Sequence, residues 1–419
     1  MRGLWHVITV SRGVPQGYQR LPLAGELLPA PVRSGPAIAA KGLRPFFLLA
    51  GVSAVALMPL WLAALFSGFD PGSYLGAMYW HAHEMVFGFT VAVIAGFLLT
   101  AVGNWTQRET VVGGPLLALA GLWLAGRCAL LGAQFLPRWL PAVVDLAFLP
   151  VLGVAIGRPL VATKNRRNYV MLVVLAALWL TNVTVHLDAL GVMPGWRRRG
   201  SLLGVDVVVF VILVMAGRIF PMFTRNATGV DSIRTIPALE KATLAATGLL
   251  FLLDLALPDA RITALAAGAT GLIVAARVVH WGTRHSLKIP LLWILHVGYA
   301  WIPLGLLLRA IAAYSDVVPA PVATHALTVG AIGGITLGMM SRVALGHTGR
   351  QLVASRPVVV SFVLVTLAAL VRVGTPLVHM AWYRTAVLVA GVCWTAAFAI
   401  FLVVYTPILL TPRVDGKAG

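Results

Sequence analysis

The segment WHAHE at residues 80–84 places two imidazoles and a carboxylate at the start of an apolar stretch that runs to residue 102. Imidazole nitrogens bind haem iron, copper and zinc. Ionisable side chains at membrane depth usually face a protein interior, a cavity or a bound ion, because hydrocarbon solvates them poorly. The segment is therefore the first candidate for a functional site.

The spacing of the two histidines limits what they can bind together. On a regular helix His81 and His83 point about 200° apart, so one small ion cannot contact both unless the helix begins irregularly. We expect one of them to bind haem or a metal ion and the other to contact a neighbouring helix or a second site. Glu84 is expected to hydrogen-bond a ligating imidazole or to take part in proton movement.

The elements that carry these residues are predicted to be transmembrane helices. The chain has 419 residues, of which 59% are hydrophobic and 11% are charged, whereas soluble domains have about 25% charged residues. Apolar stretches of about 20 residues, long enough to cross a bilayer as helices, recur throughout the chain. They lie at 46–67, 80–103, 114–134, 139–157, 168–190, 201–222, 239–257, 260–281, 289–312, 320–341, 357–379 and 383–410. The sequence thus predicts an all-α fold, a polytopic transmembrane bundle of about 12 helices.

Three regions follow from this pattern: a basic cytoplasmic tail over 1–45, a single transmembrane domain over 46–410 and a short cytoplasmic tail over 411–419. Most of the 32 Lys and Arg fall on the side of the N-terminus, so the positive-inside rule places both termini in the cytoplasm. The lipid bilayer, and no nucleic acid, therefore accounts for the net charge of +19. One loop contradicts the pattern, because Arg197, Arg198 and Arg199 are predicted to lie outside. Either this loop binds an anionic group, or one span is misplaced.

The other histidines fall at two levels along these spans. The outer level holds His81, His83, His186, His325 and His379, and the inner level holds His280, His285, His296 and His347. Two levels suit two metal centres, or one centre and a proton path. We expect the segment 80–84 to form part of one outer site built from several helices.

Further candidates lie at the inner level. His296 and Tyr299 share a helix face, so Tyr299 could order His296, or both could line a cofactor pocket. Arg218 either anchors the inner end of its span or pairs with carboxylates such as haem propionates, which suit the forked guanidinium group. Glycines recur at 330, 334 and 338, a spacing that lets helices approach closely or a flat macrocycle lie against the backbone.

Several longer blocks together resemble the NnrS family, bacterial membrane proteins associated with nitric oxide metabolism. The blocks are RPFFLLAG at 44–51, WHAHEMVFGF at 80–89, AGFLLTAVGNW at 95–105, GRIFPMFTRN at 217–226, LHVGYAWIPLGLLL at 295–308 and HALTVGAIGGITLGMMSRVALGHTGR at 325–350. The resemblance covers residues 44 to 410, nearly the whole chain apart from the basic tail.

The resemblance implies twelve helices, haem and copper as cofactors, and nitric oxide as the small-molecule ligand. It also implies a role in denitrification or nitrosative stress in the bacterial inner membrane, without a settled reaction or set of ligands. The histidines inside the matching blocks carry the prediction of the site. The candidate cofactor-binding residues are His81, His83, His296, His325, Arg218 and Tyr299. The candidate metal ligands are His81, His83, His325 and His347, with Glu84 as a hydrogen-bonding partner.

Two other functions stay open at this point. A histidine-lined transporter for metal ions or protons needs no haem, and helices interrupted by glycine occur in transporters. A redox enzyme related to nitric oxide reductases would share the twelve helices. The sequence, however, has no adjacent pair of histidines of the kind expected beside a binuclear centre.

Overall fold

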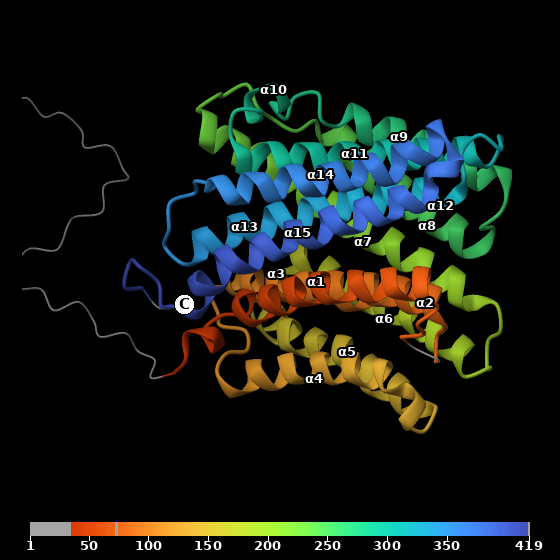
Figure 1. Cartoon of the computed structure of the whole chain (residues 1–419). Coiled ribbons are helices and arrows are strands. Elements are labelled where there is room, and N and C mark those ends of the chain that lie inside the picture. The colour runs from red at the N-terminus through yellow and green to blue at the C-terminus, as the bar shows by residue number, and fades with distance from the viewer. Residues whose placement is uncertain (1–34, 72–73, 418–419) are drawn as a thin grey trace, which may run out of the picture.

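The computed structural model of the protein describes residues 35–71 and 74–417. In this part of the chain all regular secondary structure is helical, and the long helices run side by side as one bundle (Figure 1). The predicted all-α fold is therefore confirmed. Most of the predicted basic tail, residues 1–34, lies outside the described residues. Its end, η1 (Ala37–Ala39), contacts the bundle, because the Gly113 amide donates to the Ala39 carbonyl at 2.8 Å.

Ten of the described helices are long and apolar enough to cross a membrane. They are α1 (Leu43–Ser67), α2–η2–α3 (Ala77–His83, Glu84–Thr90, Val91–Thr106), α4 (Gly114–Leu131), α5 (Trp139–Ala162), α6 (Val170–Ala189), α7 (Trp196–Thr228), α11 (Pro290–Ala312), α12–η5–α13 (Ala320–His325, Ala326–Gly333, Gly334–His347), α14 (Arg356–Val378) and α15 (Tyr383–Leu410). The helices α8 (Pro237–Ala256) and α9 (Arg261–Ala276) lie at the seventh and eighth predicted spans but are not among the ten. The number of twelve spans stays a prediction.

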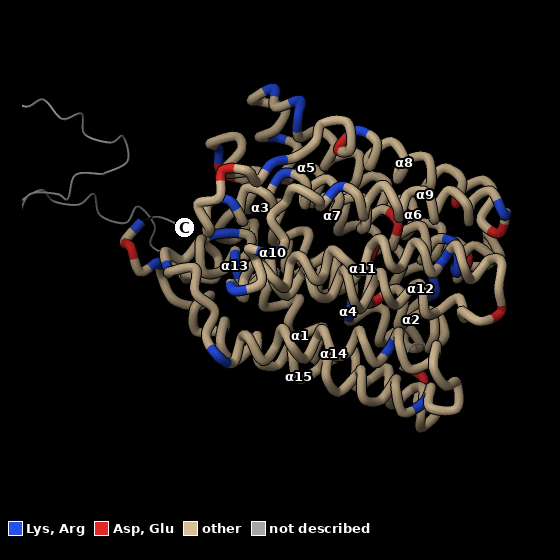
Figure 2. Tube along the Cα trace, turned by 90° about the horizontal axis from the view of Figure 1, so that it is seen from above, with Lys and Arg blue, Asp and Glu red and all other residues tan. Residues whose placement is uncertain are grey.

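The two ends of the bundle carry most of the charged residues, and the middle of the helices is mostly uncharged (Figure 2). The beginning of α1 and the end of α15 lie at the same end, where the Arg44 guanidinium donates to the Leu409 carbonyl at 2.7 Å. This end is the one predicted to face the cytoplasm, and it is called the inner end below. The opposite end is called the outer end.

The three arginines that contradicted the charge pattern form the first turn of α7 and bind groups of the protein itself. Arg197 pairs with Asp188 at 2.8 Å and donates to the Leu75 carbonyl, and Arg199 donates to the Leu255 carbonyl. Arg198 reaches within 4.0 Å of Asp259. Contacts within the fold therefore largely account for the positions of these three arginines at the outer end.

The helices that carry the first candidate histidines are the most buried in the bundle. Buried residues make up 83% of the apolar stretch of Ala77–Thr106 and 78% of that of Ala320–His347, against 44% for α1. Both change from α-helical to π-helical winding immediately after a histidine, His83 in one and His325 in the other. Such π-helical segments are rare and are frequent at functional sites, because they re-aim the side chains of one turn.

The glycines of the second π-helical region allow close packing against α11. A Cβ atom at Gly330 would overlap the Trp301 ring. A Cβ atom at Gly334 would lie 3.5 Å from the Gly298 Cα atom. The repeated glycines therefore serve helix packing, which was one of the two interpretations of their spacing.

This packing makes a first prediction. Gly330→Ala should lower the free energy of unfolding by about 1–3 kcal/mol, the usual cost of overpacking a close contact. Thermal and denaturant unfolding of the purified protein in detergent measures the change. The matched control is Gly374→Ala in α14, where the new Cβ atom meets no heavy atom within 4 Å. Equal destabilisation by both substitutions would contradict the prediction.

Candidate functional site

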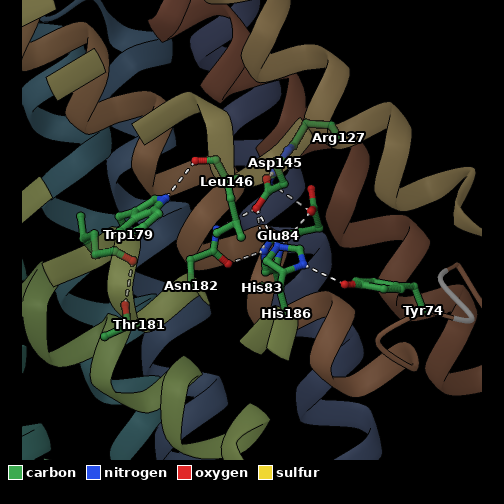
Figure 3. Close-up of polar contacts among 12 residues, drawn as sticks. Tyr74, His83, Glu84, Arg127, Asp145, Leu146, Trp179, Thr181, Asn182 and His186 are labelled. Atoms are coloured by element: carbon green, nitrogen blue, oxygen red, sulfur yellow. Dashed lines mark hydrogen bonds and ion pairs between the residues drawn. The ribbon is translucent and has the colours of Figure 1, made fainter. Parts of the chain in front are cut away.

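A cluster of polar side chains lies between α2, α4, α5 and α6 near the outer end (Figure 3). We call it the His83 cluster, and its members are Tyr74, His83, Glu84, Arg127, Asp145, Asn182 and His186. All of them except Tyr74 are buried, and the His83 side chain is completely inaccessible to solvent. Because buried polar groups in an apolar bundle are costly unless they are paired, the contacts inside the cluster decide what it can do.

The centre of the cluster is formed by two imidazoles that face one carboxylate. The Nε2 atoms of His83 and His186 lie 3.3 and 3.0 Å from the same oxygen, Oδ2 of Asp145. One ligand atom from each of the three residues can therefore be chosen so that all lie within 4.8 Å of one another. Asn182 also contacts both sides, with its Oδ1 atom 2.9 Å from His83 Nε2 and its amide nitrogen 2.7 Å from Asp145. Two imidazoles and a carboxylate are a common ligand set for divalent transition metals.

The opposite nitrogens of both imidazoles are also bound. His83 Nδ1 lies 3.2 Å from Glu84 Oε1, and His186 Nδ1 lies 3.1 Å from the Tyr74 hydroxyl. Histidines that ligate a metal through one nitrogen usually donate the other N–H to an oxygen atom, which fixes the ring and its tautomer. The arrangement is therefore the one expected of two metal-ligating histidines.

The charges of the His83 cluster also leave room for a cation. Arg127 forms ion pairs with Asp145 and with Glu84, the latter at 3.1 Å. Two carboxylates against one guanidinium give one excess negative charge when both imidazoles are neutral. In addition, Glu84 Oε2 is buried without a hydrogen-bond partner. A metal ion, or a proton on one imidazole, would balance this charge.

A second site lies beside the first, in a cavity of about 380 Å³ between α1, α2, α7, α12, α14 and α15. We call it the His81 cavity, because His81 lines it together with His325 and Arg372. Both imidazoles and the Arg372 guanidinium therefore border one shared space. The wall is otherwise mostly apolar and includes Met58, Trp61, Phe89, Val205, Ile332 and Trp394. Cofactor and ligand pockets commonly have volumes of about 300–1,000 Å³ and walls of this kind.

Two polar side chains of the His81 cavity each have one nitrogen atom without a hydrogen-bond partner. The His81 ring stacks on Trp61, with 4.5 Å between the centroids, and its Nδ1 atom is buried without a hydrogen bond. Arg372 is 7% exposed and donates to the Tyr383 hydroxyl at 3.0 Å, whereas its Nη1 atom has no acceptor. A free imidazole nitrogen and a guanidinium Nη1 atom without an acceptor, in one apolar cavity, fit a flat cofactor that carries both a metal and a carboxylate, as haem does.

The predicted residues at the inner level do not line this cavity. Both ring nitrogens of His296 contact threonine hydroxyls, Thr224 at 3.1 Å and Thr283 at 3.0 Å. The Tyr299 hydroxyl donates to a backbone carbonyl, not to His296. His296 is therefore held by two threonines and not by Tyr299, and a cofactor-binding role for the two residues stays a prediction.

Two other predicted residues are also placed elsewhere. Arg218 donates to Asn168 Oδ1 at 2.8 Å, which agrees with an anchoring role and not with a propionate contact in the His81 cavity. His347 ends α13 at the inner end, close to Lys41 and Arg413. These neighbouring cations disfavour a metal ion at His347, because they repel it.

The expectation of one outer site also needs correction. His81 and His325 share the cavity, whereas His83 and His186 share the polar cluster. His379 is exposed and stacks on Trp382. His81 and His83 diverge because the helix α2 is regular over Ala77–His83. The outer histidines thus form two adjacent sites.

The sequence interpretation missed several residues that matter to these sites, among them Tyr74, Asn182 and three charged residues. Asp145, Arg127 and Arg372 are charged residues inside apolar spans, and that property alone could have identified them. None of the three was named as a site candidate from the sequence. Their partners come from other helices, so the spacing along the chain does not reveal them.

The fold and these sites define a class: a polytopic helical membrane protein with buried histidine clusters near one end. Residues 37–413 match the family model described as NnrS protein. Because the match spans nearly the whole chain, the protein belongs to the NnrS family. None of the curated proteins compared with the chain matches it. The family and the fold fit a membrane protein of nitric oxide metabolism.

Proposed function

We propose that this protein binds haem and a copper ion in the bacterial inner membrane and serves nitric oxide metabolism or protection against nitrosative stress. One observation carries the proposal: His81 and His325 line one apolar cavity together with the buried guanidinium of Arg372, whose Nη1 atom has no acceptor. Membership of the NnrS family supports nitric oxide as the small-molecule ligand.

The His81 cavity supplies each group that haem needs from a protein. His81 and His325 would hold the iron, and stacking on Trp61 fixes the orientation of the His81 ring. Arg372 would pair with a propionate through its Nη1 atom, which has no acceptor of its own. When bound, haem would supply an iron atom, which can take nitric oxide as a ligand where the gas displaces one of the two imidazoles. The apolar wall keeps water away from this position.

The same wall suits the proposed ligand. Nitric oxide is small and uncharged, so it dissolves in hydrocarbon and needs no polar channel. The side chains of Val205, Val329, Ile332 and Val387 line the cavity and present an apolar surface to such a molecule. Two arginines line the cavity: Arg198 reaches within 4.0 Å of Asp259, and Arg372 is held by the Tyr383 hydroxyl and would be covered by the propionate.

The His83 cluster is the position that we propose for copper. Its imidazole and carboxylate donors suit Cu²⁺, which heads the usual order of affinity among divalent first-row ions. Glu84 and Tyr74 hold the two rings through their Nδ1 atoms. The histidines therefore gather in pairs around two centres and do not form a row, which favours cofactor binding over a transport path.

The optical spectrum and metal content of the purified protein test this proposal. We expect haem absorption bands that shift when nitric oxide is added anaerobically, and copper bound in proportion to protein. A preparation that folds, contains neither haem nor copper and does not respond to nitric oxide would exclude it. Uptake of metal ions by vesicles that contain such a haem-free protein would favour the transporter.

A further inference from the structure

Four cationic side chains meet at the inner end of the bundle, where α1 begins and where α13 and α15 end. We call them the inner cation cluster, and they are Lys41, Arg44, Arg350 and Arg413. Lys41 lies close enough to Arg44 and Arg413, and Arg44 close enough to Arg350, for their charges to repel each other. Like charges at such distances are unfavourable unless an anion neutralises them.

Two of the four cations already have partners within the protein. Arg44 donates to the Leu409 and Thr411 carbonyls, each at 2.7 Å, at the end of α15. Arg413 donates to the His347 carbonyl at 3.0 Å and pairs with Asp415 at 2.8 Å. This pairing holds the pKa of the Asp415 carboxyl at about 2. Cations at the carboxyl ends of helices satisfy free carbonyl groups and the helix dipole, so these two have a structural role.

The other two cations remain without a counter-charge in the described part of the chain. Arg350 reaches only the Thr411 hydroxyl at 3.4 Å, and its Nη1 atom is buried with no acceptor. Lys41 has no carboxylate beside it, and burial together with Arg413 and Arg44 lowers the pKa of its ammonium group. A buried guanidinium nitrogen without an acceptor is costly, and it indicates that an anion from outside the described chain completes the site.

We propose that the inner cation cluster binds the phosphate of an anionic phospholipid headgroup. The cluster lies where the apolar helices α13 and α15 end, which is the depth of the headgroups in a bilayer. Basic pockets between transmembrane helices on the cytoplasmic side are suited to anionic lipids, and guanidinium and ammonium groups both donate to phosphate oxygens. Inorganic phosphate shares this chemistry, but it would have to reach the site from the aqueous phase.

The test compares lipids and variants on the complete protein. Purified protein in nanodiscs of phosphatidylcholine, with or without phosphatidylglycerol, is followed by thermal unfolding, and short-chain phosphatidylglycerol is titrated in detergent. We expect phosphatidylglycerol to raise Tm and phosphatidylcholine alone not to do so. Lys41→Gln and Arg350→Gln should each weaken the affinity for phosphatidylglycerol by roughly fivefold, the loss expected for one basic residue near a membrane surface.

The matched control is Arg166→Gln, which removes the same charge from an exposed position in η4 (Arg166–Asn168) at the same end. It should leave the affinity unchanged. Arg350→Lys, which keeps the charge, guards against a folding defect and should retain most of the binding. Equal effects of the two lipids, equal losses in the control, or an equal rise in Tm with inorganic phosphate alone would overturn the proposal.

Discussion

Replacing either His81 or His325 with alanine should remove haem from the purified protein and leave the helical bundle folded. Both side chains line the same cavity, and the His81 ring packs on the neighbouring helix α1 by stacking on Trp61. His81 Nδ1 has no hydrogen bond, and His325 Nδ1 contacts the Pro321 carbonyl of its own helix at 2.6 Å. The ratio of haem to protein, measured by absorption, should fall by about tenfold or more, because each 1.4 kcal/mol of lost binding is a factor of ten.

The control for this experiment is His379→Ala, which removes an exposed outer histidine that lines neither site. It should keep both haem and the spectral response to nitric oxide. Glycine at position 81 or 325 offers a second check, since added imidazole can then occupy the vacated space and restore the absorption bands. Haem content unchanged in both alanine variants would show that the cavity is not the haem site.

Arg372→Gln gives an intermediate result that tests the propionate contact separately. We expect haem to bind about 10- to 100-fold more weakly but with the same absorption spectrum, because the residues that would hold the iron remain. Arg384→Gln is a suitable control, because Arg384 lies over the Phe66 ring and does not line the cavity. Equal haem affinity in the two variants would remove Arg372 from the proposed site.

Much of the fold could be predicted from the sequence, because hydrocarbon imposes a simple requirement on it. Apolar runs long enough to cross a bilayer identified α15 to the residue and α1 to within three residues, whereas α7 begins five residues before its predicted span and ends six residues after it. The winding within helices could not be predicted in this way. The π-helical segments after His83 and His325 depend on tertiary packing, and hydropathy does not report it. The helices α8 and α9 are not among the ten described helices that are long and apolar enough to cross a membrane.

The candidate site could be predicted only in part. Helix geometry predicted that His81 and His83 would point in different directions. In the structure His81 lines the His81 cavity, and His83 lies in the His83 cluster. His81 lies with His325, and His83 lies with His186. Each pair joins helices that are more than 100 positions apart in the sequence, so the sequence does not reveal the pairing. The inner residues His296 and Tyr299 looked equally promising, because a conspicuous local motif does not distinguish a packed histidine from a ligating one.

Asp145→Asn should remove the metal ion from the His83 cluster and also destabilise the protein. The carboxylate faces both imidazoles and pairs with Arg127, so its loss removes a ligand and leaves a buried guanidinium with only Glu84. Breaking a buried ion pair on one side costs about 3–5 kcal/mol. Elemental analysis measures the metal content, and thermal unfolding measures the stability. Asp188→Asn, which breaks the ion pair with Arg197 at the outer end of α6, should leave the metal bound.

His83→Ala separates the two centres most clearly when it is compared with His81→Ala. The two positions are only two residues apart on the same helix, but they belong to different sites. We expect this variant to lose copper and keep haem, whereas His81→Ala should lose haem and keep copper. Tyr74→Phe should weaken metal binding by about 10- to 100-fold, since it removes only the hydrogen bond that holds the His186 ring. If His83→Ala and Asp145→Asn kept the metal and lost only stability, the cluster would be a structural network of charges. Opposite losses in variants at neighbouring positions cannot arise from a general folding defect, so they would assign each histidine to its own centre.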